Sequence, residues 1–202
     1  RERGVEYVEL RCLDLNPFLP VGIDADGSRF LELLLLLCLL KPSPPLSQDE
    51  LEALSHTRAL VVEQGRRPGL LLPAGPFAQA TELKTRGLQL LKDMEVIADF
   101  LDQHGEGGYR AALTHQRACF EDPEATPSAQ VMAAVHAHDD TFFSFALEQA
   151  EQHRQYFKSL ADDPACTAQL VQEAADSLAR QQALEETDTL TFEDFLAEYF
   201  TR

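Results

Sequence analysis

The chain has 202 residues, of which 45% are hydrophobic, and this is enough to bury one sizeable core. It carries 17 basic and 34 acidic residues, which gives a net charge of −17. Nucleic acids and anionic membrane surfaces bind proteins through clustered Lys and Arg side chains, so this charge argues against both as partners. A site for a polyanionic ligand must then be locally basic, and Arg11, Arg66 and Arg67 are the natural candidates.

The opening stretch, residues 7–18, alternates as a β-strand that runs into a turn at Pro17. One side of this strand carries Val8, Leu10 and Cys12 and suits a core. Glu9 and Arg11 project from the other side, about 7 Å apart at two strand residues. Glu9 can bind a hard cation such as Mg²⁺, and Arg11 can hold a phosphate through two parallel hydrogen bonds. By spacing alone, such a pair is more often a solvated surface pair.

The segments that follow predict a mainly helical chain. The apolar run in residues 33–40 predicts a helix over residues 28–40 that is buried on all sides. This run is far shorter than the roughly 20 apolar residues of a membrane-spanning helix. Ser47 and Glu50 form the pattern of a capping box, which opens a helix that ends at Gly65. The residues predicted to face inward on this helix are Leu51, Leu54, Val61 and Val62.

Residues 65–75 predict an extended loop with a little strand. Gly65 and Gly69 permit a tight turn that would present Arg66 and Arg67 to a nucleotide or to another part of the protein. A surface loop with two solvated arginines is the equally weighted alternative. Further helices are predicted over residues 83–104, 109–120, 127–137, 141–160, 165–186 and 191–199. Thr126 and Pro127 predict the N-cap and the first helical position of the helix over residues 127–137.

The histidines at positions 136 and 138 and the four cysteines do not indicate a metal site or a reactive thiol. His136 and His138 do not face each other on a helix, so we expect no metal site there. The four cysteines, at positions 12, 38, 119 and 166, lack CxxC spacing. We expect them to be free, with Cys12, Cys38 and Cys119 in apolar surroundings, and we expect a reducing, cytoplasmic location.

Four segments, in chain order, resemble bacterial glutamate–cysteine ligase, also called γ-glutamylcysteine synthetase. Residues 7–18, YVELRCLDLNPF, resemble its (Y/I)-x-E-x-R-S-L-D-x-N-P-F segment, with Cys12 where Ser is more common. Residues 63–70, EQGRRPGL, resemble its E-G-R-K-P-G-L stretch, and residues 118–123, ACFEDP, its A-C-F-D-N-P. Residues 177–196, SLARQQALEETDTLTFEDFL, resemble its closing S-x-x-R-Q-Q-x-x-E-x-x-D-x-x-x-F-x-x-(W/F)-L.

This resemblance implies an α+β enzyme of the glutamine synthetase superfamily that joins the γ-carboxylate of L-glutamate to the amine of L-cysteine. It uses ATP, with Mg²⁺ or Mn²⁺, and passes through γ-glutamyl phosphate. It further implies that Glu9 is a metal ligand and that Arg11 faces the phosphates as a catalytic residue. Arg66 and Arg67 are weaker candidates for cofactor binding.

The resemblance also implies how the chain is organised. Residues 1–202 would be the C-terminal portion of one catalytic domain, with the active-site strand and turn in 1–18 and a mainly helical part in 28–202. The larger N-terminal portion would be missing, and the chain alone inactive. We expect a monomer that binds no nucleic acid and no membrane. The alternative is a non-catalytic helical interaction module that docks through its N-terminal strand, which has no need of Glu9 and Arg11 facing one cleft.

Overall fold

The computed structural model describes residues 4, 7–11, 13–74, 79–160 and 163–201. They form two compact units that divide after Gln155, and each is described here on its own. The part of the chain that the structure describes is mostly helical, with one two-stranded sheet. None of its helices is long and apolar enough to cross a membrane.

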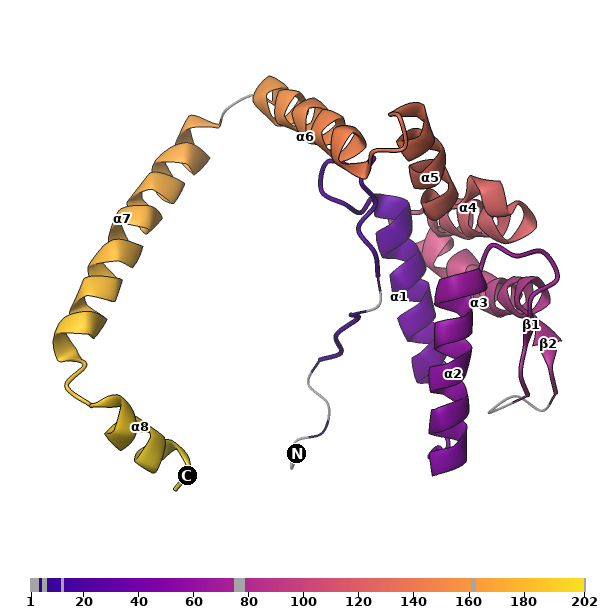
Figure 1. Ribbon diagram of the computed structural model, residues 1–202, viewed down its shortest axis with the longest axis horizontal. Helices are drawn as coiled ribbons and strands as arrows, with labels where there is room; N and C mark the ends of the chain where they lie inside the picture. Colours follow the sequence, from indigo (N-terminus) through magenta and orange to yellow (C-terminus); the bar gives the residue numbers. More distant parts are fainter. Residues whose placement is uncertain (1–3, 5–6, 12, 75–78, 161–162, 202) are drawn as a thin grey trace. The chain divides into compact units, whose positions relative to one another are not determined.

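The first unit contains six helices, a 3₁₀ helix and the small sheet (Figure 1). The helical elements are α1 (Ala25–Leu40), α2 (Gln48–Gln64), α3 (Leu83–His104), α4 (Tyr109–Glu121), η1 (Pro123–Ala125), α5 (Pro127–Ala137) and α6 (Phe142–Ser159), whose last residues belong to the second unit. Strands β1 (Leu71–Leu72) and β2 (Thr81–Glu82) pair antiparallel, with Leu71 opposite Glu82.

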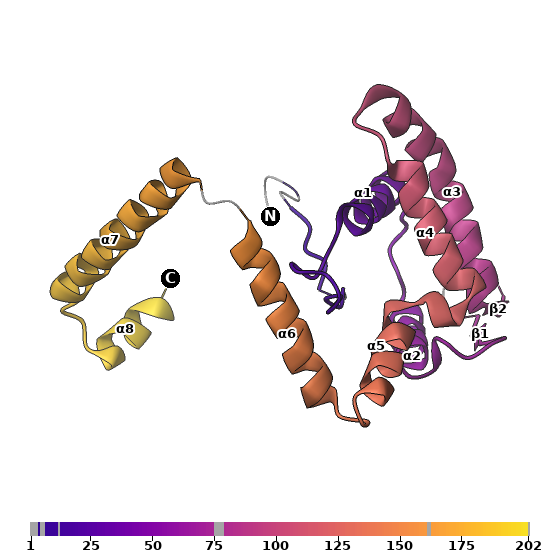
Figure 2. The ribbon, with the colours of Figure 1, turned by 90° about the horizontal axis from the view of Figure 1, so that it is seen from above.

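The core of the first unit lies where α1, α3 and α4 contact one another. Figure 2 shows α3 and α4 running alongside each other. Its buried residues are Leu33, Leu37, Leu91, Met94, Ala98 and Leu113. On α3 the buried positions are spaced by three, four and seven residues, so they form one stripe that faces the other two helices.

Local capping signals fix several helix starts as predicted. Ser47 and Glu50 form the capping box: the Ser47 hydroxyl accepts from the Glu50 amide, and the Glu50 carboxylate accepts from the Ser47 amide. Hydrogen bonds from Ser47 lower the pKa of the Glu50 carboxyl. At α5, the Thr126 hydroxyl accepts from the Ala129 amide, and Pro127 occupies the first helical position.

The strand predicted to open the segment 7–18 is not formed in the described part of that segment. Residues 7–11 have no strand pairing, and Cys12 lies outside the described residues. Val8 and Leu10, predicted to face a core, are 64% and 40% exposed. A strand is stabilised by hydrogen bonds to a neighbouring strand. In the described part of the chain β1 and β2 pair with each other, so residues 7–11 have no such neighbour.

Helix α1 forms as predicted but is not buried on all sides. Leu33 and Leu37 are buried, whereas Leu39 and Leu40 are 79% and 70% exposed. Cys38, expected in an apolar environment, is also exposed. Within the described residues α3 and α4 cover one face of α1, and a helix packed in this way buries one stripe of side chains.

The inward face of α2 also differs from the prediction. Thr57 is the buried residue, while Leu51 and Val62 are 49% and 80% exposed. At about 100° per residue, Leu54 and Val61 lie within about 60° of Thr57 around the helix, but Leu51 and Val62 lie about 120–140° away. Apolar character alone therefore selected two residues on the wrong face.

The second unit contains α7 (Pro164–Thr187) and α8 (Phe192–Tyr199). Asp163 caps α7 by accepting from the Ala165 and Cys166 amides, and Thr191 caps α8 by accepting from the Asp194 amide. Neither helix has a buried residue among those described. These two helices are therefore set by local caps and propensity more than by a core of their own.

Candidate functional site

Glu9 and Arg11 contact each other, although the strand predicted to present them on one face is not formed in the described residues. Arg11 Nη2 donates to Glu9 Oε2 over 2.9 Å. Both side chains are exposed, Arg11 at 81% and Glu9 at 53%. An exposed ion pair of this kind contributes about 0–1 kcal/mol, so either group can exchange its partner for another ligand at little cost.

The turn that follows the Glu9–Arg11 segment ties it to the first unit. Asn16 Oδ1 accepts from the Phe18 amide, and the Asn16 amide donates to the Gly22 carbonyl. The Phe18 ring packs 5.6 Å from the ring of Phe145, which is fully buried. The predicted turn is therefore present, and it anchors the chain just after the exposed pair.

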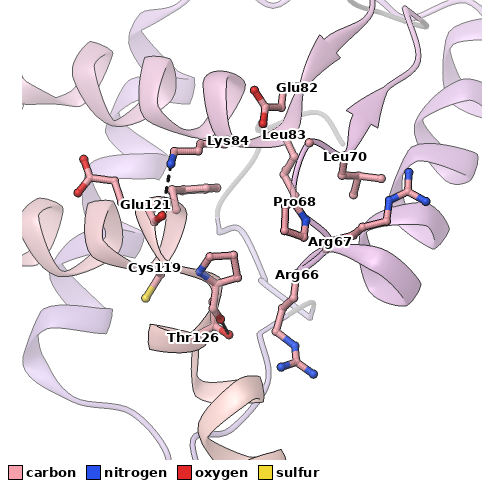
Figure 3. Close-up of a pocket in the computed structure, with 14 residues that line it drawn as sticks. Arg66, Arg67, Pro68, Leu70, Glu82, Leu83, Lys84, Cys119, Glu121 and Thr126 are labelled. Carbon is pink, nitrogen blue, oxygen red and sulfur yellow. Dashed lines mark hydrogen bonds between the residues drawn. The ribbon is translucent and has the colours of Figure 1, made fainter.

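Arg66 and Arg67 line a pocket of about 350 Å³, which is the second candidate site. They occupy a tight turn in which the Arg67 amide donates to the Gln64 carbonyl and the Leu70 amide to the Arg67 carbonyl. Gly69 has φ +69, a left-handed conformation that Gly adopts without strain. The other pocket walls come from the start of α3, the end of α4, and residues 123 and 126 (Figure 3).

The two guanidinium groups point away from each other in Figure 3. Arg66 Nη1 lies 3.9 Å from Glu124 Oε1. Among the described residues, the Arg67 side chain has no hydrogen bond or ion pair. One phosphate group therefore does not reach both arginines in this conformation.

Lys84 is a third basic residue of the pocket that the sequence did not single out. Its Nζ donates to the Glu121 carbonyl oxygen at the end of α4 over 3.3 Å, as Figure 3 shows. In the sequence, its position at the start of a predicted helix is the signal that could have drawn attention to it. Glu82 and Glu121 also line the pocket, so both positive and negative side chains surround it.

Cys119 lines the same pocket but has the character of a structural thiol. Its Sγ lies 3.7 Å from the Ala125 carbonyl oxygen. Burial raises the pKa of the Cys119 thiol, which disfavours the reactive thiolate. Cys38, Cys119 and Cys166 are all free.

The two candidate histidines each contact a carboxylate. His136 Nδ1 pairs with Asp140, and His138 Nε2 lies 2.5 Å from Glu148 Oε2. Within the described ranges, no three His, Cys, Asp or Glu side chains converge in a way that could hold a metal ion. Glu9 and Arg11 lie before α1 and Arg66 and Arg67 after α2, and no hydrogen bond or ion pair between described residues joins the two pairs.

Comparison with known proteins relates the chain to one enzyme. A family model described as glutamate-cysteine ligase matches residues 1–61, which include Glu9 and Arg11 but not Arg66 and Arg67. The chain is 43% identical to the glutamate–cysteine ligase of Alcanivorax borkumensis over 201 residues, 99% of the chain and 38% of the relative. It is 44% identical to that of Pseudomonas paraeruginosa over 200 residues, 98% of the chain and 37% of the relative.

A solved structure gives the same relationship at the level of the fold. The glutamate–cysteine ligase of Francisella tularensis, crystallised in complex with AMP, matches with a TM-score of 0.87 and 30% sequence identity. The match covers 98% of this chain and 39% of that one. The chain is therefore similar to glutamate–cysteine ligases over nearly all of its own length, while it spans well under half of theirs.

Proposed function

We propose that this chain is the C-terminal part of a glutamate–cysteine ligase, which joins the γ-carboxylate of L-glutamate to the amine of L-cysteine in the first step of glutathione synthesis. The observation that carries the proposal is the 43% identity over 201 residues to one such enzyme. The chain spans 38% of that relative, which supports the proposal that other residues of the active site come from outside this chain.

The reaction proposed has two steps. A γ-carboxylate oxygen of glutamate attacks the γ-phosphorus of ATP, and ADP leaves. The cysteine amine then attacks the activated carbonyl carbon and loses a proton, and phosphate leaves with one oxygen that came from glutamate. Both steps need positive groups that are held ready where negative charge moves.

Arg11 is the residue proposed to meet this need. Its planar guanidinium can hold two oxygens of the transferring phosphoryl group at once. It is 81% exposed, and its partner among the described residues is the exposed Glu9, so it can turn to a phosphate at a cost of about 1 kcal/mol or less. The family model covers this segment, which supports the assignment.

Glu9 is proposed as a ligand of Mg²⁺ or Mn²⁺. Its carboxylate is the hard oxygen donor that Mg²⁺ prefers, and Mg²⁺ takes six oxygens, several of them from water and substrate phosphates. One exposed carboxylate fits such a site as a single ligand. When bound, the ion would neutralise triphosphate charge, while Glu9 positions it beside Arg11.

Arg66 and Arg67 are proposed to contact the nucleotide from the pocket. The AMP complex of the Francisella tularensis enzyme supports an adenine nucleotide as the ligand. Because the two guanidinium groups diverge, we treat them as two separate contacts. Arg67, which has no ion-pair partner among the described residues, would bind at less cost than Arg66, which lies near Glu124.

We further propose that the enzyme acts as a monomer in the cytoplasm. The three described cysteines are free, which supports a reducing compartment. Ten of the 47 residues from position 156 onward are acidic and three are basic. Mutual repulsion of these acidic segments would oppose pairing between two copies through α7 and α8.

The proposal is tested with a chimera in which this chain replaces the matched 201 residues of the Alcanivorax borkumensis ligase. The chimera should form γ-glutamylcysteine from glutamate, cysteine and ATP, and the 202-residue chain alone should not. Glutamate labelled with ¹⁸O in its γ-carboxylate should deliver one ¹⁸O to the released phosphate. The unmodified ligase serves as the control.

Three results would contradict the proposal. A chimera that melts cooperatively near the parent temperature yet forms no product would show that this chain cannot fill the role of the segment it replaced. Product formation by the chain alone would show that the site is complete within it. Absence of ¹⁸O from phosphate would reject the acyl-phosphate route.

A further inference from the structure

Helix α6 is attached to the rest of the first unit by few contacts. Phe145 is the buried residue of α6, and its ring lies 5.6 Å from that of Phe18 and 6.0 Å from that of His138. The turn between α5 and α6 contains Asp139 and Asp140, with φ of 54° and 58°. Left-handed backbone is uncommon outside Gly, although Asp tolerates it better than most residues. Contacts around this turn therefore decide how α6 leaves α5.

His138 makes the polar contact that joins the two helices. Its Nδ1 lies 2.7 Å from the Ala134 carbonyl oxygen on α5, and its Nε2 lies 2.5 Å from Glu148 Oε2 on α6. A carbonyl oxygen and a carboxylate oxygen only accept hydrogen bonds. Both ring nitrogens must therefore carry a proton, so the geometry requires the imidazolium form.

Loss of that proton would break one of the two contacts. A neutral imidazole has one N–H and one lone pair, so it can donate to Ala134 or to Glu148 but not to both. The remaining nitrogen lone pair would then face an oxygen lone pair. Because the His138 side chain is only 26% exposed, water compensates this incompletely.

We propose that the His138–Glu148 ion pair is a pH-dependent conformational device that holds α6 against the end of α5 when His138 is protonated and releases it when His138 loses its proton. The charged groups that act on His138 are Glu148 from α6 and Asp139 from the turn, both acidic. Asp140 pairs with His136 instead. The N-terminal segment and the first turn of α6 present the rings of Phe18 and Phe142 to Phe145.

The direction of the pH effect follows from these groups. The hydrogen bond to Glu148, and then that to the Ala134 carbonyl, raise the pKa of His138 above 6.5, and His138 in turn lowers the pKa of Glu148. Because the pKa of His138 is raised when α6 is docked, protonated His138 stabilises the docked state fully at pH values below the pKa of undocked His138, about 6.5. This stabilisation is lost as the pH rises through the pKa of His138 in the docked state.

The test combines histidine NMR with hydrogen exchange on the 202-residue chain. The His138 resonance, identified by its loss in His138→Gln, should titrate with a midpoint above 6.5. Amide protection of residues 142–148, corrected for intrinsic exchange, should fall over the same pH range. The ratio between its acid and alkaline plateaus should be about tenfold for each pH unit that separates the docked and undocked pKa values.

Two variants make the test specific. Glu148→Gln should lower the His138 midpoint and make the protection of α6 insensitive to pH. Glu151→Gln, on the same helix and paired with Arg154, should leave both unchanged. Protection in the parent chain that stays constant between about pH 5.5 and 8.5, or an unchanged midpoint in Glu148→Gln, would overturn the proposal. If His138→Gln does not fold, the pH dependence of amide protection in the parent chain and in Glu148→Gln still decides it.

Discussion

Gly87 on α3 lies directly against the ring of Phe120 on α4. A Cβ placed on Gly87 would sit 2.2 Å from Cε1 of that ring, closer than a Cβ atom approaches non-bonded atoms in proteins. The missing side chain therefore lets the two helices come close together at this point. Phe120 also lines the pocket of Arg66 and Arg67, so this contact helps to place one wall of that pocket.

The added methyl of Gly87→Ala should cost about 1–3 kcal/mol, because it forces the Phe120 ring or the helices to move. Ala also favours a helix by about 1 kcal/mol relative to Gly, so the net destabilisation should be up to about 2 kcal/mol. Urea unfolding measures the change. Combining it with Phe120→Leu should recover part of the loss, and strictly additive effects would show that the two residues are not coupled.

Asp102 on α3 caps the next helix, since its two carboxylate oxygens accept from the Tyr109 and Arg110 amides over 2.8 and 2.9 Å. Gly108, at the N-cap position, has no side chain to do this. Asp102→Ala should therefore destabilise the chain by about 1–2 kcal/mol at pH 7. Asp99→Asn is the control, because the hydrogen bonds of the Asp99 side chain to described residues go to the exposed Arg110 side chain, and it should cost under about 1 kcal/mol.

The effect of Asp102→Ala should depend on pH. The hydrogen bond from the Arg110 amide is the main cause that lowers the pKa of Asp102 below 3.8. A carboxyl group whose pKa is lower in the folded state stabilises that state at any pH above its pKa in the unfolded chain. This stabilisation disappears as the pH falls through the pKa of the folded state. The difference between the parent and Asp102→Ala in urea unfolding should therefore shrink below about pH 4. A difference that stays constant down to acid would show that the carboxylate charge plays no part.

Predictions from the sequence succeeded where the physics is local. The capping box of Ser47 and Glu50 and the cap at Thr126 act within one helical turn, and both are present as predicted. Apolar spacing likewise located α3. The turn at Asn16 needed only the residues next to it.

The misses concern contacts that one segment cannot specify alone. Alternation at residues 7–12 expresses a preference for a strand, but forming one needs a partner. The cap that Asp102 places on α4 and the ion pair of His138 with Glu148 join separate elements, so no local motif marks them. Metal and phosphate roles for Glu9 and Arg11 came from the family resemblance and remain predictions.

Glu9→Gln in the chimera should raise the Mg²⁺ concentration needed for half-maximal activity by roughly tenfold or more, since it removes the charge of a proposed ligand and keeps its shape. Stability should change by under about 1 kcal/mol, because the pair with Arg11 is exposed. Activity assays across a Mg²⁺ series, beside melting curves, measure both. An unchanged Mg²⁺ dependence would remove Glu9 from the metal site.

Arg66→Ala and Arg67→Ala in the chimera should each raise the KM for ATP by roughly threefold to tenfold, in line with loss of one charged hydrogen bond. Because the guanidinium groups diverge, the effects should multiply in the double variant. Arg58→Ala, on the exposed surface of α2, is the control and should leave KM unchanged. If Arg66→Ala and Arg67→Ala leave the KM for ATP unchanged, as the control does, the two arginines belong to a solvated surface loop and do not bind the nucleotide.

The most direct test of the central claim is the turnover number of the Arg11→Lys chimera. Lys keeps the charge but lacks the planar fork that holds two phosphate oxygens, so kcat for γ-glutamylcysteine formation should fall by roughly 10²-fold or more. KM for ATP should change little, since the lost contact acts mainly in the transition state. The melting curve should match that of the parent chimera, because Lys can replace Arg11 in an exposed pair with Glu9 at about 1 kcal/mol or less. A fully active Arg11→Lys chimera would contradict the account and leave the segment before α1 with a structural role.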